Sequence, residues 1–515
     1  MKVAFVLRST SGPRGDVDLG SHAVGDVDPE LLSPAKQAVL ARWRDGRLTA
    51  DQRGTDSGRL TANQRIEHDP QRTRFPLSVR QRVAWSFELL SPANPANTLF
   101  FCASVRGFLD ESALREALRV LVDRHAVLRT VIDGTPGREQ QVVLASIAMA
   151  LDIVDLTDRG AGDAERHAVA HAQSVIAQGF DVRHGPLARV VLYRLGDESR
   201  ILVLQIHHII ADGWSFGVAL FELRSIYESL LEGRDPALPP LPIQYGDFSI
   251  WEHEWLRTQD LTALGQYWGP RLRGAPALAL GDDHPAGDRR DISGASVDLV
   301  LEDAITSAMR RVCRECGATT FMCLVAGIAV LCHALSGATD VAIEAVLANR
   351  MLPETQGLIG MFINNLPLRV DLSGDPTFRE LLSRVQTVCG PAYATQQVPL
   401  EALLESLDID HASDGTPIAQ VELVFQNWPA PAMRLGSAEF ARLELDQTFS
   451  FHDLEFHLWD GPVIAGRVAY KTALFEEDSV RGKLHVLKRI LSDGTRSPDR
   501  RLSDLISEIA REEMT

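Results

Sequence analysis

The strongest restriction on the fold of this chain comes from residues 201–232, ILVLQIHHIIADGWSFGVALFELRSIYESLLE. The first six of these residues are mainly apolar and branched, which predicts a buried strand. From Phe216 onward apolar residues recur at helical spacing, which predicts a helix with Ser215 as its N-cap. The tight loop between the strand and the helix carries two imidazoles, a carboxylate and a glycine: His207, His208, Asp212 and Gly213.

These loop residues have the chemistry of a catalytic site. An imidazole can exchange a proton with a substrate near neutral pH. Asp212 can orient an imidazole or hold the loop by pairing with a distant cation, and a backbone N–H near Gly213 can face a developing oxyanion. The alternative is a buried histidine pair and an Asp-Gly turn without chemistry. The combination of both features between a strand and a capped helix favours a functional site.

The loop reads HHxxxDG, and the chain resembles the condensation domains of nonribosomal peptide synthetases, which carry this signature. Epimerisation domains and wax-ester-type acyltransferases share HHxxxDG, so the resemblance depends on further motifs, which follow the family's order over about residues 75–510. Their matching residues are Ser78, Gln81, Arg82, Trp85, Arg124, His125, Leu128, Arg129, Thr130, Tyr245, Asp247, Phe248, Trp251, Asn349, Arg350, Gly360, Phe362, Asn364, Leu366, Pro367 and Arg369. The departures are Glu344 for the usual Gly, Asn365 for Thr, Gln397 for Asp and Leu400 for Phe.

The resemblance implies an α/β fold with two chloramphenicol acetyltransferase-like lobes in a V shape around a central tunnel. The first lobe is expected at residues 75–245, with a Pro-rich end near 231–242, and the second at 246–515. The alternation of helices and strands in the first lobe agrees with an α/β class. An apolar buried helix is expected at 317–336 and a strand at 341–350.

The resemblance also implies the reaction and its residues. A nucleophile attacks an acyl thioester on the phosphopantetheine arm of a partner carrier protein, and no cofactor is bound by the chain itself. His208 would be the functional histidine, as a base or as a positioning group, and His207 mainly structural. Arg350 would pair with Asp212, and a buried pair of this kind is structural. Supporting roles are expected for Trp214, Ser215 and Asn364.

Residues 1–74 form a separate leader. Residues 1–30 are expected to be flexible, and 31–74 form a small docking-type region with a short helix from Ser33. GRLTADQR at 46–53 recurs as GRLTANQR at 58–65, which fits a β-hairpin, a polar linker or two weak helical turns. Nine Lys/Arg against five Asp/Glu over 36–74 leave a local charge of +4. The region loosely resembles β-hairpin docking domains, so an acidic carrier tail could bind its arginines: Arg47, Arg53, Arg59 and Arg65.

Composition narrows the class of protein further. The 45% apolar and 23% charged residues are typical of a globular protein, and the net charge of −17 argues against nucleic acid as a partner. No apolar run reaches membrane-spanning length and no signal peptide is evident, so the expected location is the cytoplasm. The six scattered cysteines, including a CxxC at 313–316, predict reduced thiols rather than a metal site.

Several alternatives stay open at this point. Both histidines exclude the heterocyclising subfamily, and the opening motif fits condensation better than epimerisation. Some family members only recruit partners and have lost the histidines, which both remain here. Without adenylation or carrier sequences, the enzyme is expected to act in trans, and a small-molecule acceptor is one option. It would form an amide or an ester, and the step could release a finished chain.

Overall fold

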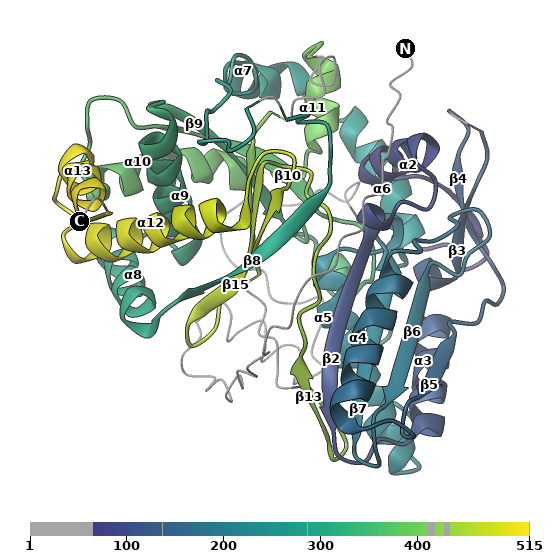
Figure 1. Ribbon diagram of the computed structural model, residues 1–515. Coiled ribbons are helices and arrows are strands. Elements are labelled where there is room, and N and C mark those ends of the chain that lie inside the picture. The colour runs from purple at the N-terminus through teal and green to yellow at the C-terminus, as the bar shows by residue number, and fades with distance from the viewer. Residues whose placement is uncertain (1–64, 136, 286, 410–417, 427–432, 514–515) are drawn as a thin grey trace.

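A computed structural model describes residues 65–513, except 136, 286, 410–417 and 427–432. It contains two lobes, each built on a six-stranded sheet with helices packed against it (Figure 1). The α/β class expected from the sequence is confirmed. Most of the docking-type region lies outside the described residues, including Arg47, Arg53, Arg59 and the expected hairpin.

The sheet of the first lobe has the strand order β12-β13-β2-β7-β6-β5. Its strands are β2 (Thr98–Arg106), β5 (Leu151–Asp155), β6 (Ala188–Arg194), β7 (Ser199–His207), β12 (Met433–Leu435) and β13 (Ala438–Arg442). A small sheet of the order β1-β4-β3 lies beside it: β1 (Arg74–Pro76), β3 (Thr130–Asp133) and β4 (Gln140–Val143). The helices are α2 (Val79–Leu90), α3 (Glu111–Arg124), α4 (Ala161–Ile176), α5 (Gly213–Leu231) and α6 (Tyr245–Arg257).

Strand β7 lies at the centre of this sheet, and all its residues after Ser199 are buried. Apolar side chains of α3 and α5 cover one face, and alanines of α4 cover the other. A strand covered on both faces is continuously apolar, which explains the run that the sequence shows at 201–206.

The sheet of the second lobe has the order β10-β9-β11-β14-β15-β8. Its strands are β8 (Gly294–Leu301), β9 (Asp340–Leu347), β10 (Asn364–Asp371), β11 (Val421–Gln426), β14 (Leu454–Trp459) and β15 (Ile464–Lys471). The helices are α7 (Leu261–Leu272), α8 (Asp303–Cys316), α9 (Thr320–Ser336), α10 (Phe378–Ala394), α11 (Leu400–Ser406), α12 (Glu477–Arg496) and α13 (Leu502–Glu513). The described residues of both lobes also include short 3-10 turns, which are η3 (Pro95–Asn97), η4 (Ala126–Arg129), η5 (His208–Ile210) and η6 (Pro353–Thr355).

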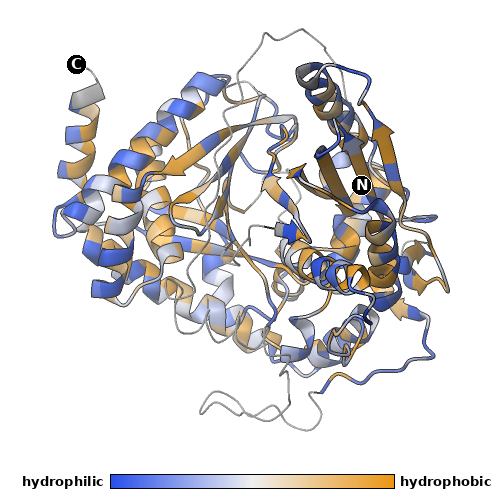
Figure 2. Ribbon diagram, turned by 90° about the horizontal axis from the view of Figure 1, so that it is seen from below, coloured by the Kyte–Doolittle hydropathy of each residue, from blue (hydrophilic) through white to orange (hydrophobic). Residues whose placement is uncertain are grey.

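The apolar core of the second lobe surrounds α9, which is buried almost throughout, as the sequence predicts. Apolar strands lie inside the lobes, while outer helices such as α12 alternate between polar and apolar residues (Figure 2). No single described helix is long and apolar enough to cross a membrane; α8 and α9 meet the criterion only together, with a bend of 108° between them. All six cysteines are free thiols.

The lobes do not divide cleanly at residues 245 and 246. Strand β13 pairs antiparallel with β2, with Ala441 opposite Ser104, so residues 433–442 extend the first lobe's sheet (Figure 1). Side chains of the segment 352–362 and of helix α6 also join the first lobe's core. The expected second lobe, 246–515, therefore contributes three segments to the first, because each covers apolar surface that the first lobe leaves open.

One local expectation needs correction. The N-cap of α5 is Asp212 rather than Ser215: the Asp212 carboxylate accepts the N–H of Ser215, and the Ser215 hydroxyl accepts the N–H of Asp212. This reciprocal arrangement starts the helix three residues earlier than the sequence pattern indicates.

Candidate active site

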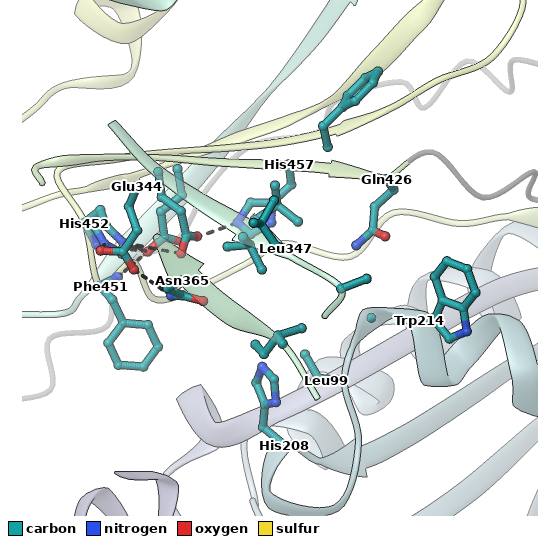
Figure 3. A pocket seen from close by; sticks show the side chains of 18 of the residues that line it. Leu99, His208, Trp214, Glu344, Leu347, Asn365, Gln426, Phe451, His452 and His457 are labelled. Atoms are coloured by element: carbon teal, nitrogen blue, oxygen red, sulfur yellow. Dashed lines mark hydrogen bonds and ion pairs between the residues drawn. The ribbon is translucent and has the colours of Figure 1, made fainter. Parts of the chain in front are cut away.

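A cavity of about 1790 Å³ separates the facing sides of the two lobes. The first lobe contributes the HHxxxDG loop and strand β2, and the second contributes strands β9, β11 and β14. The side chains of Leu99, His208 and Trp214 lie across the cavity from those of Glu344 and His457 (Figure 3). The loop predicted to be catalytic therefore borders a space large enough for a substrate.

Asp212 holds the loop in place and does not face the cavity. It is fully buried, and its two oxygens lie 2.9 and 3.1 Å from Nη2 of Arg350, the partner expected from the resemblance. The N–H of Phe362 donates to Oδ2 at 3.0 Å. Arg350 also donates to the carbonyls of Thr355 and Leu358 at 2.6 Å. The pair thus joins the HHxxxDG loop to the segment that arrives from the second lobe.

His207 points away from the cavity into the first lobe. Its Nδ1 accepts the N–H of Ile209 at 3.0 Å, so the ring proton is on Nε2. That Nε2–H donates to Glu88 Oε1 at 3.1 Å, and both side chains are buried. His207 therefore fixes the turn after β7, as a structural residue would.

His208 is the histidine that borders the cavity, and it is partly buried. Its Nδ1 lies 2.8 Å from the carbonyl of Ala211, which can only accept, so Nδ1 carries the proton. The unprotonated Nε2 makes no hydrogen bond to a described residue. Burial lowers the pKa of the ring below its ordinary 6.5, so the ring is neutral at pH 7. A fixed, neutral imidazole with an available lone pair can accept a proton or a hydrogen bond.

Gly213 stands at the first position of α5 and also borders the cavity. Within the described chain its amide N–H donates no hydrogen bond, and such orphan donors at a helix start favour negative charge. A Cβ atom at this position would come within 2.7 Å of Gln426 Nε2. The glycine therefore lets the end of β11 approach the start of α5 closely.

Of the other residues expected to support the site, Trp214 and Ser215 follow this loop directly, and Asn364 lies farther away. Trp214 Nε1 donates to the carbonyl of Gln356 at 2.9 Å, and Ser215 Oγ donates to that of Gly360 at 3.0 Å. Asn364 does not border the cavity: it binds the backbone at Gln396, Val398 and Leu400 within the second lobe. Arg65 is exposed and is the only predicted docking arginine among the described residues.

Sequence reasoning missed three groups of residues around the site. Gln81 is fully buried and donates to the carbonyl of Ile209 at 2.9 Å, although the sequence showed only its place in a motif. Arg80 bridges the lobes through an ion pair with Glu401. The third group lies on the second lobe's wall, in adjacent strands and a loop: Glu344, Glu422, His452, Glu455 and His457. Of these, the sequence singled out only Glu344, as a departure from the family pattern.

Two overlapping sets in this third group have the donor atoms of a cation site. Glu344, Glu422 and His452 form one set, and Glu422, Glu455 and His457 form the other; within each, the candidate ligand atoms lie within 4.8 Å of one another. Burial, together with Glu455 and Glu344, raises the pKa of Glu422 to about 7. Burial alone would lower the pKa of His452, but the charges of Glu422 and Glu344 raise it well above its ordinary value.

The profile of the Condensation domain family matches residues 71–515. One polypeptide of the linear gramicidin synthase of Brevibacillus parabrevis is 34% identical over 437 residues, which are 84% of this chain and 8% of that polypeptide. Among solved structures, the X-domain from teicoplanin biosynthesis aligns with a TM-score of 0.74 and 27% identity, over 86% of this chain and 99% of the X-domain. The SgcC5 protein of Streptomyces globisporus aligns with a TM-score of 0.70 and 28% identity, over 83% and 100%.

The chain therefore belongs to the condensation domain family of nonribosomal peptide synthesis, as its motifs predict. Members of this family usually catalyse amide-bond formation and work with carrier proteins. The chain spans less than a tenth of the length of the gramicidin synthase polypeptide that it matches.

Proposed function

We propose that this chain is an acyltransferase that joins a carrier-bound acyl thioester to an amine or a hydroxyl group. The observation that carries the proposal is the geometry of His208: its Nδ1–H is held by the carbonyl of Ala211, and its Nε2 borders a cavity lined by both lobes. An imidazole in this state can take the proton from an attacking nucleophile or hold that nucleophile in position.

The remaining site residues have distinct proposed roles. The amide of Gly213, at the start of α5, is placed to stabilise the oxyanion of the tetrahedral intermediate. Asp212 and Arg350 keep the loop in its active shape, and His207 sets the turn before it. The phosphopantetheine arm of the partner carrier protein supplies the thioester. The apolar lining between the lobes suits its acyl chain.

The product is proposed from one relative. The SgcC5 structure contains (R)-(-)-1-(2-naphthyl)-1,2-ethanediol, a hydroxyl compound, and this supports an ester as well as an amide product. Action in trans and a chain-releasing step stay predictions from the sequence. Docking of an acidic carrier tail on residues 31–74, at Arg47, Arg53, Arg59 and Arg65, stays a prediction, as does a cytoplasmic location.

A second candidate function is recruitment of another protein without catalysis. The X-domain of teicoplanin biosynthesis, 28% identical over 88% of this chain, has been solved in complex with OxyB. A recruitment domain has no need of a neutral imidazole facing a cavity, so the site favours the acyltransferase.

The test is His208→Ala, with carrier protein loaded with acyl groups and incubated with a panel of amines and alcohols. Removal of a positioned proton acceptor should lower product formation about 10²–10⁴-fold, as measured by intact mass. The transfer rate of the wild-type protein should stay constant above neutral pH and fall only in acid. The reason is that burial lowers the pKa of His208, so the ring is protonated only at acidic pH. His184→Ala, which removes an exposed imidazole, is the control. Unchanged product formation by His208→Ala would remove this residue from the mechanism.

A further inference from the structure

Three glutamates stand side by side on the cavity wall of the second lobe, and we call Glu344, Glu422 and Glu455 the carboxylate row. Strand β11 pairs in parallel with β9 and with β14, and its register places Glu422 opposite both Glu344 and Glu455. Neighbouring strands lie about 4.8 Å apart, and like charges directly opposite one another destabilise a sheet. A row of three carboxylates therefore needs positive charge nearby.

Two histidines supply part of that charge. His452 lies 3.5 Å from Glu344 and 3.4 Å from Glu455, and His457 Nε2 lies 3.3 Å from Glu455 Oε2 (Figure 3). Both ring nitrogens of His452 face carboxylate oxygens, which is the arrangement of a protonated imidazole. Even with both histidines protonated, three carboxylates leave one negative charge on the row.

That uncompensated charge lies on Glu422. Asn365 donates to Glu344 at 2.6 Å, and the N–H groups of Phe451 and His452 donate to Glu455 at 2.6 and 2.9 Å. Glu422, in contrast, is 9% exposed and accepts no hydrogen bond within the described chain; its nearest cation is His452 at 4.0 Å. A buried carboxylate without a donor is costly unless a ligand supplies one.

Three further cations that border the cavity are already paired. Arg289 is bound by Asp282 and Asp453, and Lys471 lies 4.0 Å from Asp453. Arg80 is bound by Glu401. None of these three side chains is left to neutralise Glu422. Burial raises the pKa of Glu422 to about 7, so the carboxyl is only partly ionised near neutral pH, and a cation in the cavity would stabilise its ionised form.

We propose that the carboxylate row, and Glu422 above all, binds a primary ammonium group on the acyl donor or on the acceptor. This inference rests on the acyltransfer function proposed above. The ammonium is a second group and not the attacking one, because a protonated amine has no lone pair with which to attack a thioester. The substrate class is therefore an aminoacyl donor, or an acceptor that carries an amine in addition to its nucleophile.

An ammonium fits this site better than a metal ion does. A metal ligand must be deprotonated, and His452 is held in its protonated form by the carboxylates around it. Both oxygens of Glu455 are already engaged. The single remaining charge on the row matches one monocation with hydrogen-bond donors.

The test compares thioester donors of N-acetylcysteamine with and without an amine. Hexanoyl is paired with ω-aminohexanoyl, and shorter and longer ω-aminoacyl chains find the length that reaches the row. Wild-type protein should bind the best amine-bearing donor about 10-fold or more tightly than its plain partner, since a charge-assisted hydrogen bond is gained. The acceptor arm compares 1-hexanol with 6-amino-1-hexanol, which adds an ammonium to the same hydroxyl nucleophile, so the preference shows which substrate carries the ammonium. Dissociation constants are measured by calorimetry.

Glu422→Gln keeps the shape of the side chain and removes its charge, so it should abolish the preference and leave binding of the plain compound unchanged. Glu444→Gln is the matched control, because Glu444 borders the same cavity but pairs with Arg442 at 2.5 Å. Glu344→Gly restores the residue usual in the family and should weaken the preference for the amine-bearing compound. It replaces Glu422→Gln as the test variant if Glu422→Gln fails to fold.

Three results would overturn the inference. The first is that neither arm shows a preference for the amine-bearing compound. The second is that Glu422→Gln weakens binding of both compounds equally, and the third is stoichiometric zinc binding that Glu422→Gln abolishes. Binding is measured separately from transfer. Amine-selective binding without any product would therefore contradict the proposed acyltransferase function and still support the ammonium site.

Discussion

Single side chains in this site are set by the donors and acceptors that surround them. His207 and His208 are adjacent in the chain, yet one is locked into the first lobe by Glu88 and the other borders the cavity. The two rings have different surroundings because β7 ends at His207, and the chain then leaves the sheet and turns through η5. A sequence pattern shows two equal imidazoles, and the turn makes them unequal.

Asp212→Ala tests the structural role of the aspartate. The substitution leaves the buried guanidinium of Arg350 without its carboxylate, so the free energy of unfolding should fall by about 3–5 kcal/mol. Denaturant titration followed by circular dichroism measures it. The control is Asp499→Ala, which breaks an exposed pair with Arg379 and should cost less than about 1 kcal/mol. A loss as small as that for Asp212→Ala would show that Arg350 does not depend on this partner.

Among the secondary structure elements, the start of α5 and the end of β11 come together from opposite lobes. The capping box of Asp212 and Ser215 fixes where the helix begins, and Gly213 then leaves room for Gln426. Both residues border the same cavity as His208. This contact joins residues 213 positions apart in the chain, so no local pattern could have indicated it.

Gly213→Ala should disturb this contact and leave the fold intact. The added methyl group would displace the Gln426 side chain, and we expect kcat/KM for transfer to fall about 10-fold, with the melting temperature nearly unchanged. In a Gln426→Ala background the same substitution should have an effect of less than about 2-fold. If the loss is the same in both backgrounds, crowding against Gln426 is not its cause.

Across the molecule as a whole, the two lobes are interlocked. Strand β13 completes the first lobe's sheet, the segment 352–362 completes its core, and the Asp212–Arg350 pair crosses between them. Either lobe alone would expose apolar surface that the other now covers.

Thermal unfolding should therefore be one cooperative event. Scanning calorimetry of the full chain is expected to show a single transition, with calorimetric and van't Hoff enthalpies that agree. Two separate transitions would mean that the crossing segments contribute little to the stability of the first lobe. In the same measurement on Arg350→Ala, the single transition should move to a lower temperature but should not split, because the crossing strands still connect the lobes.

The elements with local signals could be predicted from the amino-acid sequence. The apolar run of β7, the helical spacing of α5, the buried helix α9 and the HHxxxDG loop are all readable from neighbouring residues, and the ordered motifs identified the family and predicted the Asp212–Arg350 pair. The resemblance also gave His208 the functional role, and the fold added the turn that places this residue at the cavity. Two features became visible only in the folded chain: the place of residues 433–442 in the first lobe's sheet, and the alignment of Glu344, Glu422 and Glu455 across three strands. The reason is physical: strand register and lobe contacts depend on which distant surfaces bury one another, and no window of adjacent residues contains that information.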